Sequence, residues 1–131
     1  MKIGIMGGSF DPIHSGHIDM AEKCKKEFGL DKIMFLPSGD PPHKNNITPK
    51  EIRIEMVSAA IKNIDGFFLS RIEIDRRGKT YTYDTALELK ETDDEYYFII
   101  GGDSLNNLHN WFMAEELFKI MRFVVVDKIE K

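Results

Sequence analysis

Residues 6–17 read Met-Gly-Gly-Ser-Phe-Asp-Pro-Ile-His-Ser-Gly-His, and this stretch decides the fold. An apolar run at residues 3–6 precedes it and a segment with helical periodicity begins at Ile18, which predicts a strand, a glycine-rich turn and a helix. Adjacent glycines let a ligand approach backbone N–H groups that a Cβ atom would shield. The helix N-terminus adds about half a positive charge at the same place. We therefore predict that the turn binds a phosphate group.

Two histidines, His14 and His17, lie where this helix would begin. They could bind a metal ion, pack as polar residues of the fold, or donate to phosphate oxygens. A metal ion is the weakest of these, because Asp11 precedes a proline and no third ligand follows at a regular spacing. Phosphate contact is favoured, since imidazole N–H groups at a helix N-terminus can meet developing negative charge without forming a covalent bond. We predict no metal-ligating residues.

The composition indicates one compact domain over residues 1–131, of which 42% are hydrophobic. The net charge of −4 disfavours a nucleic acid as partner. The single cysteine, Cys24, is expected to be a buried thiol rather than a nucleophile, which suits a reducing cytoplasm. The sequence has neither a signal-peptide pattern nor an apolar run of membrane-spanning length, so we expect a cytoplasmic protein with no membrane partner.

Strand and helix signals alternate along the rest of the chain, which is typical of βαβ units around a parallel sheet. Further strands are predicted at residues 32–36, 67–74, 96–100 and 123–126. Helices are predicted at residues 15–28, after a capping box at 48–51, after a cap at Thr80 or Thr82, and at 111–121. Together they predict an α/β fold, a three-layer, doubly wound, Rossmann-like sheet of five parallel strands in the order 3-2-1-4-5.

Two of the predicted helices have apolar stripes that should face the sheet. The first is expected to bury Ile18, Ala21, Cys24 and Phe28, and to end at Gly29. The second is expected to bury Ile52, Met56, Val57 and Ala60.

Doubly wound sheets bind ligands outside the carboxyl ends of their strands, beside strand one. The motif candidates that follow strands one, two and four all fall at that edge. The glycines after strand one do not fit G-x-G-x-x-G, and no acidic residue ends strand two, so a redox dinucleotide site is disfavoured. A P-loop is disfavoured as well, because no Gly-Lys-Ser or Gly-Lys-Thr occurs.

The histidine-containing turn resembles the H-x-G-H signature of the nucleotidylyltransferase superfamily. Further similarities lie at residues 41–44, 80–82, 101–104 and at Trp111, and together they resemble the nicotinate-nucleotide adenylyltransferase family over residues 2–126. The resemblance implies adenylyl transfer from ATP to nicotinate mononucleotide in NAD biosynthesis, with Mg²⁺ carried by the ATP phosphates. It leaves open whether the protein is a homo-oligomer.

The resemblance also implies an ATP site. His14 and His17 would grip the ATP phosphates and stabilise charge at the α-phosphorus, and Lys44 would add a cation. Lys44 could equally be a solvated lysine, and Asp103 could cap the following turn rather than bind a ribose hydroxyl. The other residues implied to line the ATP site are Gly7, Gly8, Ser9, Phe10 and Gly101.

The acceptor site is implied in the same way. Trp111 would stack on the pyridine ring, and backbone N–H groups near Thr82 and Phe112 would receive the pyridine carboxylate. A tryptophan buried in the core is the alternative for Trp111.

The sequence departs from the family pattern at its C-terminal end. Family members continue further, with an Ile-Ser-Ser/Ala-Thr-x-Ile-Arg helix start that holds ATP phosphates, and residues 127–129 replace a usual Arg-Pro-Gly. Two alternatives therefore stay open. One is a nucleotide-binding domain with weak or no turnover, and the other is an adenylyltransferase for another phosphate acceptor, such as phosphopantetheine.

Overall fold

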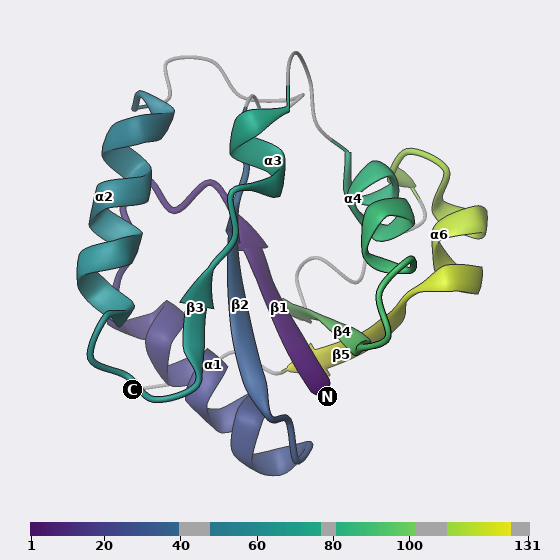
Figure 1. Cartoon of the computed structure of the whole chain (residues 1–131), viewed down its shortest axis with the longest axis horizontal. Coiled ribbons are helices and arrows are strands. Elements are labelled where there is room, and N and C mark those ends of the chain that lie inside the picture. Colours follow the sequence, from purple (N-terminus) through teal and green to yellow (C-terminus); the bar gives the residue numbers. More distant parts are fainter. Residues whose placement is uncertain (40–47, 77–80, 102–109, 127–131) are drawn as a thin grey trace.

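The computed structural model describes residues 1–39, 48–76, 81–101 and 110–126, which form one sheet with helices on both faces (Figure 1). The strands are β1 (Lys2–Gly8), β2 (Lys32–Pro37), β3 (Phe67–Leu69), β4 (Glu95–Gly101) and β5 (Arg122–Val126). The helices are α1 (Ser15–Glu27), α2 (Lys50–Ile61), α3 (Ile72–Asp75), α4 (Thr82–Leu89) and α6 (Ala114–Ile120).

The five strands are parallel and stand in the order β3-β2-β1-β4-β5, so the predicted doubly wound sheet is confirmed. β1 lies at the centre, paired with β2 on one side and β4 on the other. The winding reverses at β1, because the chain first moves outward to β2 and β3 and then crosses to β4 and β5. The carboxyl end of β1, at Gly7 and Gly8, is therefore the place where such a sheet binds ligands.

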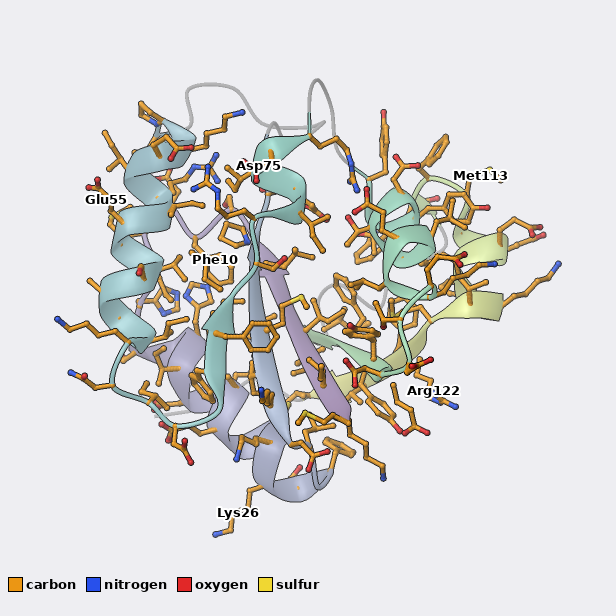
Figure 2. All side chains as sticks on the ribbon, viewed as in Figure 1. Phe10, Lys26, Glu55, Asp75, Met113 and Arg122 are labelled. Atoms are coloured by element: carbon orange, nitrogen blue, oxygen red, sulfur yellow. The ribbon has the colours of Figure 1, made fainter. Side chains whose placement is uncertain are left out.

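Each face of the sheet has its own apolar cluster. Successive side chains of a strand point to opposite faces. In β2, Ile33 and Phe35 join the cluster that includes residues of α1 and α2. Met34 and Leu36, which alternate with them, join the cluster that includes residues of α4 and α6. Polar side chains such as Glu55 on α2 point away from the sheet (Figure 2). Because helices pack on both faces of the sheet, the predicted three layers are present.

Helix α1 follows the prediction closely. Ala21 and Cys24 are buried, Ile18 is half-buried, and Gly29 follows the C-cap with φ 61°. Phe28 is an exception at 43% exposed, because it is the C-cap residue and no longer follows the helical spacing. Burial raises the pKa of Cys24 to about 11, which confirms a buried thiol. No helix in the described part of the chain is long and apolar enough to cross a membrane.

Helix α2 turns a different face to the sheet from the one predicted. Ile52 and Ala60 are exposed and Met56 is half-buried, so the predicted stripe is wrong at these positions. Arg53 is buried on the inward side of α2 instead, where its guanidinium donates to four backbone carbonyls. The buried residues of α2 are Arg53, Ile54, Val57 and Ile61.

The predicted third strand is too long. β3 ends at Leu69, and residues 72–75 form the one-turn helix α3. β3 is an edge strand that pairs with β2 at three positions only. Arg71 bridges Asp75 across the helical turn at 3.1 Å. Alternating Ile72 and Ile74 resemble a strand, but so short an apolar pattern does not separate strand from helix.

Three helix starts also differ from the prediction. α2 begins at Lys50 after Pro49 with no side-chain hydrogen bond at its cap, so the capping box is wrong. α4 begins after Tyr81, which is its N-cap in place of either threonine. α6 begins after Met113, whose left-handed backbone (φ 54°) ends an irregular segment where the helix was expected. The strands predicted at 3–6, 32–36, 96–100 and 123–126 are confirmed as β1, β2, β4 and β5.

Candidate active site

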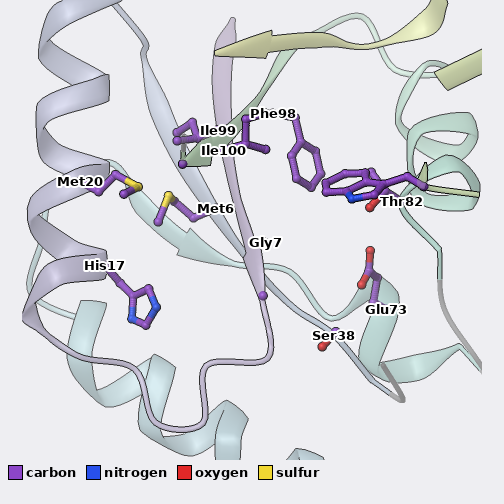
Figure 3. A pocket seen from close by; sticks show the side chains of 13 residues that line it. Met6, Gly7, His17, Met20, Ser38, Glu73, Thr82, Phe98, Ile99 and Ile100 are labelled. Atoms are coloured by element: carbon purple, nitrogen blue, oxygen red, sulfur yellow. The ribbon is translucent and has the colours of Figure 1, made fainter. Parts of the chain in front are cut away.

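A cavity of about 470 Å³ opens at the carboxyl ends of β1, β2 and β4 (Figure 3). Its volume is in the range of roughly 300–1,000 Å³ that is usual for small-molecule sites. Its position at the carboxyl ends of the strands is the edge of the sheet where the sequence predicts a ligand. Its lining residues are Met6, Gly7, Gly8, His17, Met20, Ser38, Glu73, Thr82, Phe98, Ile99, Ile100, Gly101 and Trp111.

The H-x-G-H turn joins β1 to α1 on one side of this cavity. His14 is the N-cap residue of α1, and its Nδ1 accepts a hydrogen bond from the Gly16 N–H at 3.1 Å. The Nδ1 of His17 accepts from the His14 N–H at 3.0 Å. The two imidazoles thus cap the helix reciprocally, as Ser and Glu do in a capping box. Their rings stack with centroids 3.9 Å apart.

These hydrogen bonds fix where each neutral ring carries its proton. An Nδ1 atom that accepts from a backbone N–H has no proton of its own, so the proton is assigned to Nε2. Both histidines therefore offer an Nε2–H donor. A Cβ atom at Gly16 would lie 2.9 Å from His14 Cε1, so a side chain there would displace the capped ring. This contact favours glycine at this position of the motif.

His17 is held in its neutral form. Burial lowers its pKa below the ordinary value of 6.5, and the neighbouring His14 lowers it further. Protonation would also place a hydrogen on Nδ1 and break the cap. The ring can therefore donate to an anion at neutral pH without exchanging protons. Within the described ranges, no group of three or more His, Cys, Asp or Glu side chains could hold a metal ion.

Ser9 and Phe10 belong to the turn but do not line the cavity. Phe10 is 3% exposed, and its ring packs edge-on against His17 with a centroid distance of 5.0 Å. It also packs against Phe35 at 5.8 Å. Its backbone is left-handed (φ 50°), an uncommon conformation for a phenylalanine. The carbonyl of Ser9 accepts from Arg53 Nη1 at 2.9 Å. Both residues thus support the turn from below.

Aromatic rings form the opposite wall. Trp111 lies edge-on to Phe98 with centroids 6.1 Å apart, and to Phe123 at 6.4 Å. Thr82, the first residue of α4, lines the cavity beside them. The backbone N–H groups of a first helical turn have no partners inside the helix. In Figure 3, Thr82 and Phe98 lie across the cavity from His17.

Phe112 does not line the cavity. It is 49% exposed and packs on Tyr81 with ring centroids 4.6 Å apart. Its ring is also edge-on to Tyr83 at 6.2 Å. In this position Phe112 covers the start of α4, which carries Thr82.

The structure brings part of the predicted site together. The predicted residues that line the cavity are Gly7, Gly8, His17, Thr82, Gly101 and Trp111. His14 stacks on His17 but is exposed and does not line the cavity. Lys44 and Asp103 lie outside the described residues.

Glu73 lines the cavity and was not anticipated. Its Oε2 accepts from Thr85 Oγ1 at 2.7 Å, and that hydroxyl accepts from Arg76 Nη1 at 3.1 Å. These contacts join α3 to α4. In the sequence, Glu73 stands between two isoleucines and resembles the solvent side of a strand, so its position gave no signal of a site.

Arg53 and Ser38 were also not anticipated. Ser38 lines the cavity just after β2, and its N–H donates to the Gly8 carbonyl at 2.8 Å. Arg53 is buried beneath the turn. A signal for Arg53 does exist, since it lies on one helical row with Val57 and Ile61 at spacings of four residues.

Comparison with known proteins agrees with this geometry. A family model described as cytidylyltransferase-like matches residues 5–129. The curated "Probable nicotinate-nucleotide adenylyltransferase" of Listeria monocytogenes (serotype 4a, strain HCC23) is 44% identical over 131 residues, covering 97% of this chain and 70% of the relative. The chain belongs to the nicotinate-nucleotide adenylyltransferase family. The family resemblance predicted from the sequence is thus confirmed.

A second family member gives a similar match. The protein of the same name from Clostridium botulinum (strain Alaska E43) is 42% identical over 129 residues, covering 97% of this chain. This chain spans 64% of the length of the Clostridium relative and 70% of the Listeria one.

Solved structures of the family share the fold. The Plasmodium falciparum nicotinic acid mononucleotide adenylyltransferase complexed with NaAD has a TM-score of 0.79 at 22% identity, covering 99% of this chain and 76% of that one. The Plasmodium enzyme complexed with APC has a TM-score of 0.74 at 21% identity, covering 99% and 75%. The five-stranded sheet is thus the fold of this family.

Proposed function

We propose that the chain transfers the adenylyl group of ATP to nicotinate mononucleotide, giving deamido-NAD and pyrophosphate in NAD biosynthesis. ATP would enter with Mg²⁺ on its phosphates. The names of the curated relatives support this reaction, as do the ligands of the Plasmodium complexes. The observation that carries the proposal is the capped imidazole pair, with its two Nε2–H donors at the start of α1.

The imidazole pair suits a phosphate for an electrostatic reason. Backbone N–H groups at the start of α1 donate to the two Nδ1 atoms. The partial positive charge of the helix N-terminus therefore polarises each ring and makes its Nε2–H a stronger donor. Hydrogen bonds in such a chain polarise one another and strengthen the final donor. No acidic side chain lies in the first turn of α1 to oppose an anion. His17 is the member of the pair that lines the cavity.

The reaction needs positioning and charge stabilisation rather than a nucleophilic side chain. A phosphate oxygen of nicotinate mononucleotide would attack the α-phosphorus of ATP in line. The bond from the α-phosphorus to the bridging oxygen would break, and its electron pair would leave with pyrophosphate. Negative charge would shift toward the leaving group, where His14, His17 and Lys44 would stabilise it. Among these, His17 is already preorganised by its cap and by the ring of Phe10.

The aromatic wall would receive the acceptor. Trp111 and Phe98 offer apolar surface for a pyridine ring, and the N-terminus of α4 at Thr82 would attract the pyridine carboxylate. Gly7 and Gly8 leave room for the nucleotide above β1, Gly101 ends β4 beside it, and the family resemblance assigns the ATP ribose to Asp103.

A pyrophosphate-release assay tests the proposal. The protein is given ATP and Mg²⁺ with nicotinate mononucleotide, nicotinamide mononucleotide or phosphopantetheine, each in a separate reaction. We expect release with nicotinate mononucleotide and little with the other two. Melting shifts with ATP but no release from any acceptor would instead support a nucleotide-binding domain without turnover. Pyrophosphate release with phosphopantetheine alone would support an adenylyltransferase that acts on phosphopantetheine.

A further inference from the structure

Arg53, in the first turn of α2, is an arginine with only 1% of its surface exposed. Its guanidinium donates to backbone carbonyls on every edge. Nη1 donates to Ser9 at 2.9 Å and to Ser38 at 2.7 Å, while Nη2 donates to Gly39 at 2.9 Å. Nε donates to Thr48 at 2.8 Å. One side chain thus gathers carbonyls from three separate segments.

The three segments meet at the edge of the sheet that carries the cavity. Ser9 directly follows β1, Ser38 and Gly39 directly follow β2, and Thr48 precedes Pro49, the N-cap residue of α2. A second bond ties the last of them to the H-x-G-H turn, because the Thr48 N–H donates to Asp11 Oδ2 at 2.9 Å. Arg53 is therefore the point where the loops after β1 and β2 are joined to α2.

The contacts of Arg53 lead to the imidazole pair in two steps. The Ser9 carbonyl that Arg53 holds belongs to the peptide before Phe10, whose backbone is left-handed. The Phe10 ring then packs edge-on against His17. A backbone conformation that phenylalanine rarely adopts persists only where neighbouring contacts determine it. The bond from Arg53 is such a contact.

We propose that Arg53 is a positioning residue that fixes the phosphate-binding turn through the Ser9 carbonyl and Phe10. The consequence for ATP binding rests on the proposed function, whereas the consequence for the packing of Phe10 on His17 does not. Arg53 acts through other residues, since it does not line the cavity.

The shape of the side chain, and not its charge alone, is what the arrangement requires. A guanidinium is planar and presents five N–H donors in a rigid fork, which lets Nε, Nη1 and Nη2 reach carbonyls on different segments. A lysine at this position would keep the charge but concentrate its donors at one atom. Arg53→Lys therefore separates positioning from simple attraction of an anion by a buried charge.

The test compares Arg53→Lys and Arg53→Met with Arg71→Lys. Arg71 is a matched control, because it is an exposed arginine that pairs with Glu51 and Asp75 away from the cavity. MgATP affinity is measured by calorimetric titration, and NMR follows the nuclear Overhauser contact between the Phe10 ring and the His17 imidazole. We expect both Arg53 variants to lose at least tenfold in affinity and to weaken this contact. The Arg71 control should stay within twofold.

A double-mutant cycle with His17→Ala shows whether Arg53 acts through the turn. In the His17→Ala background, Arg53→Lys should change MgATP affinity by less than twofold, because the group that it positions is gone. A merely structural arginine would cost the same factor in both backgrounds, and that additivity would overturn the proposal.

Other outcomes are equally decisive. An Arg53→Lys protein with the affinity and the Phe10–His17 contact of the wild type would overturn the proposal and leave only an effect of charge. If Arg53→Met fails to fold, Arg53→Lys still decides. If the wild type binds no MgATP, the proposed function fails. The contact between Phe10 and His17 then remains the test of Arg53, and its persistence in Arg53→Lys would overturn the proposal.

Discussion

The two sides of the cavity hold their side chains by different means. On the α1 side, His14 and His17 are fixed by hydrogen bonds between residues two and three positions apart in the sequence. On the opposite side, Trp111 is held by packing against Phe98 of β4 and Phe123 of β5. The bond from Thr85 to Glu73, which joins α4 to α3, also spans twelve residues. One side is built locally, and the other depends on the assembled fold.

This difference predicts how each side responds to substitution. Changes to the imidazole pair should alter chemistry and lower the free energy of unfolding by no more than a lost helix cap typically costs, about 0.5–2 kcal/mol, because few distant contacts are lost. Changes to the aromatic side should reduce ligand binding and stability together, since the same rings form the wall and part of the core. Separate measurements of turnover, ligand binding and unfolding can therefore distinguish the two sides of the cavity.

The largest expected effect is that of His17→Ala on turnover. Removing one preorganised donor to developing charge typically costs about 10²–10³ in kcat, or roughly 3–4 kcal/mol. We expect this loss in kcat, with little change in KM for nicotinate mononucleotide, measured by steady-state pyrophosphate release. Asp19→Ala, an exposed substitution on the same helix, is the matched control.

The melting temperature of His17→Ala is as informative as its kinetics. A fall in kcat with only a small fall in melting temperature, as expected for a lost helix cap, would agree with a locally built site. A large fall in melting temperature would mean that His17 supports the whole fold, and the contrast between the two sides would then be lost.

Trp111→Ala should have the next largest effect, on binding of the acceptor. Stacking of a base on an aromatic ring contributes roughly 1–3 kcal/mol, so we expect KM for nicotinate mononucleotide to rise by the corresponding factor while kcat changes little. The melting temperature should fall as well. Phe118→Ala removes a ring that packs on Phe123 without lining the cavity, and serves as control. An equal rise in KM for both variants would contradict stacking by Trp111.

The same contrast explains how much of the fold was predictable. Short apolar runs sufficed to predict β1, β2, β4 and β5, because strands that are buried on both faces read as continuous apolar segments. Their order followed from the doubly wound arrangement that alternating strands and helices favour. The inward face of α2 was wrong, since nothing in the sequence states that Arg53 will meet four carbonyls. The short α3 was taken for strand because one helical turn is too brief to show its period.

The site divides along the same line. The imidazole pair could be found because its partners lie within the motif itself. Glu73 could not, because its partner Thr85 is defined only when α3 packs beside α4. The role expected of Phe112 rests on a backbone N–H, and the packing of its ring on Tyr81 at the start of α4 had no signal in the sequence. Spacing alone does not identify partners that are distant in the sequence, although burial can still leave a helical row, as it does for Arg53.

Thr85→Val tests the long-range side without touching an aromatic ring. The substitution removes the hydroxyl that donates to the buried Glu73 carboxylate, and a buried acceptor that loses a partner typically costs about 1–3 kcal/mol. We expect urea denaturation to show this loss in the free energy of unfolding. Thr92→Val, at an exposed threonine, should cost much less, because water replaces its contacts. Equal costs would mean that the junction between α3 and α4 contributes little.

The smallest expected effect is a pH dependence of stability that arises from His17. Its pKa is lowered in the folded protein, so as pH falls below the ordinary value of 6.5 the unfolded chain takes up a proton that the folded protein does not. Stability should therefore fall as the pH drops below that value, and level off once it is below the lowered pKa. Above it, His17 should contribute no pH dependence.

His17→Asn isolates this effect from the titration of carboxylates. An asparagine oxygen can accept from the His14 N–H and keep the cap, but it does not titrate. Urea midpoints of both proteins at about pH 7.5 and about pH 5.5 should show a larger drop for the wild type. If both drop equally, the imidazole is not held neutral by its surroundings. The assignment of His17 as a neutral Nε2–H donor would then be wrong, even if the geometry of the turn were unchanged.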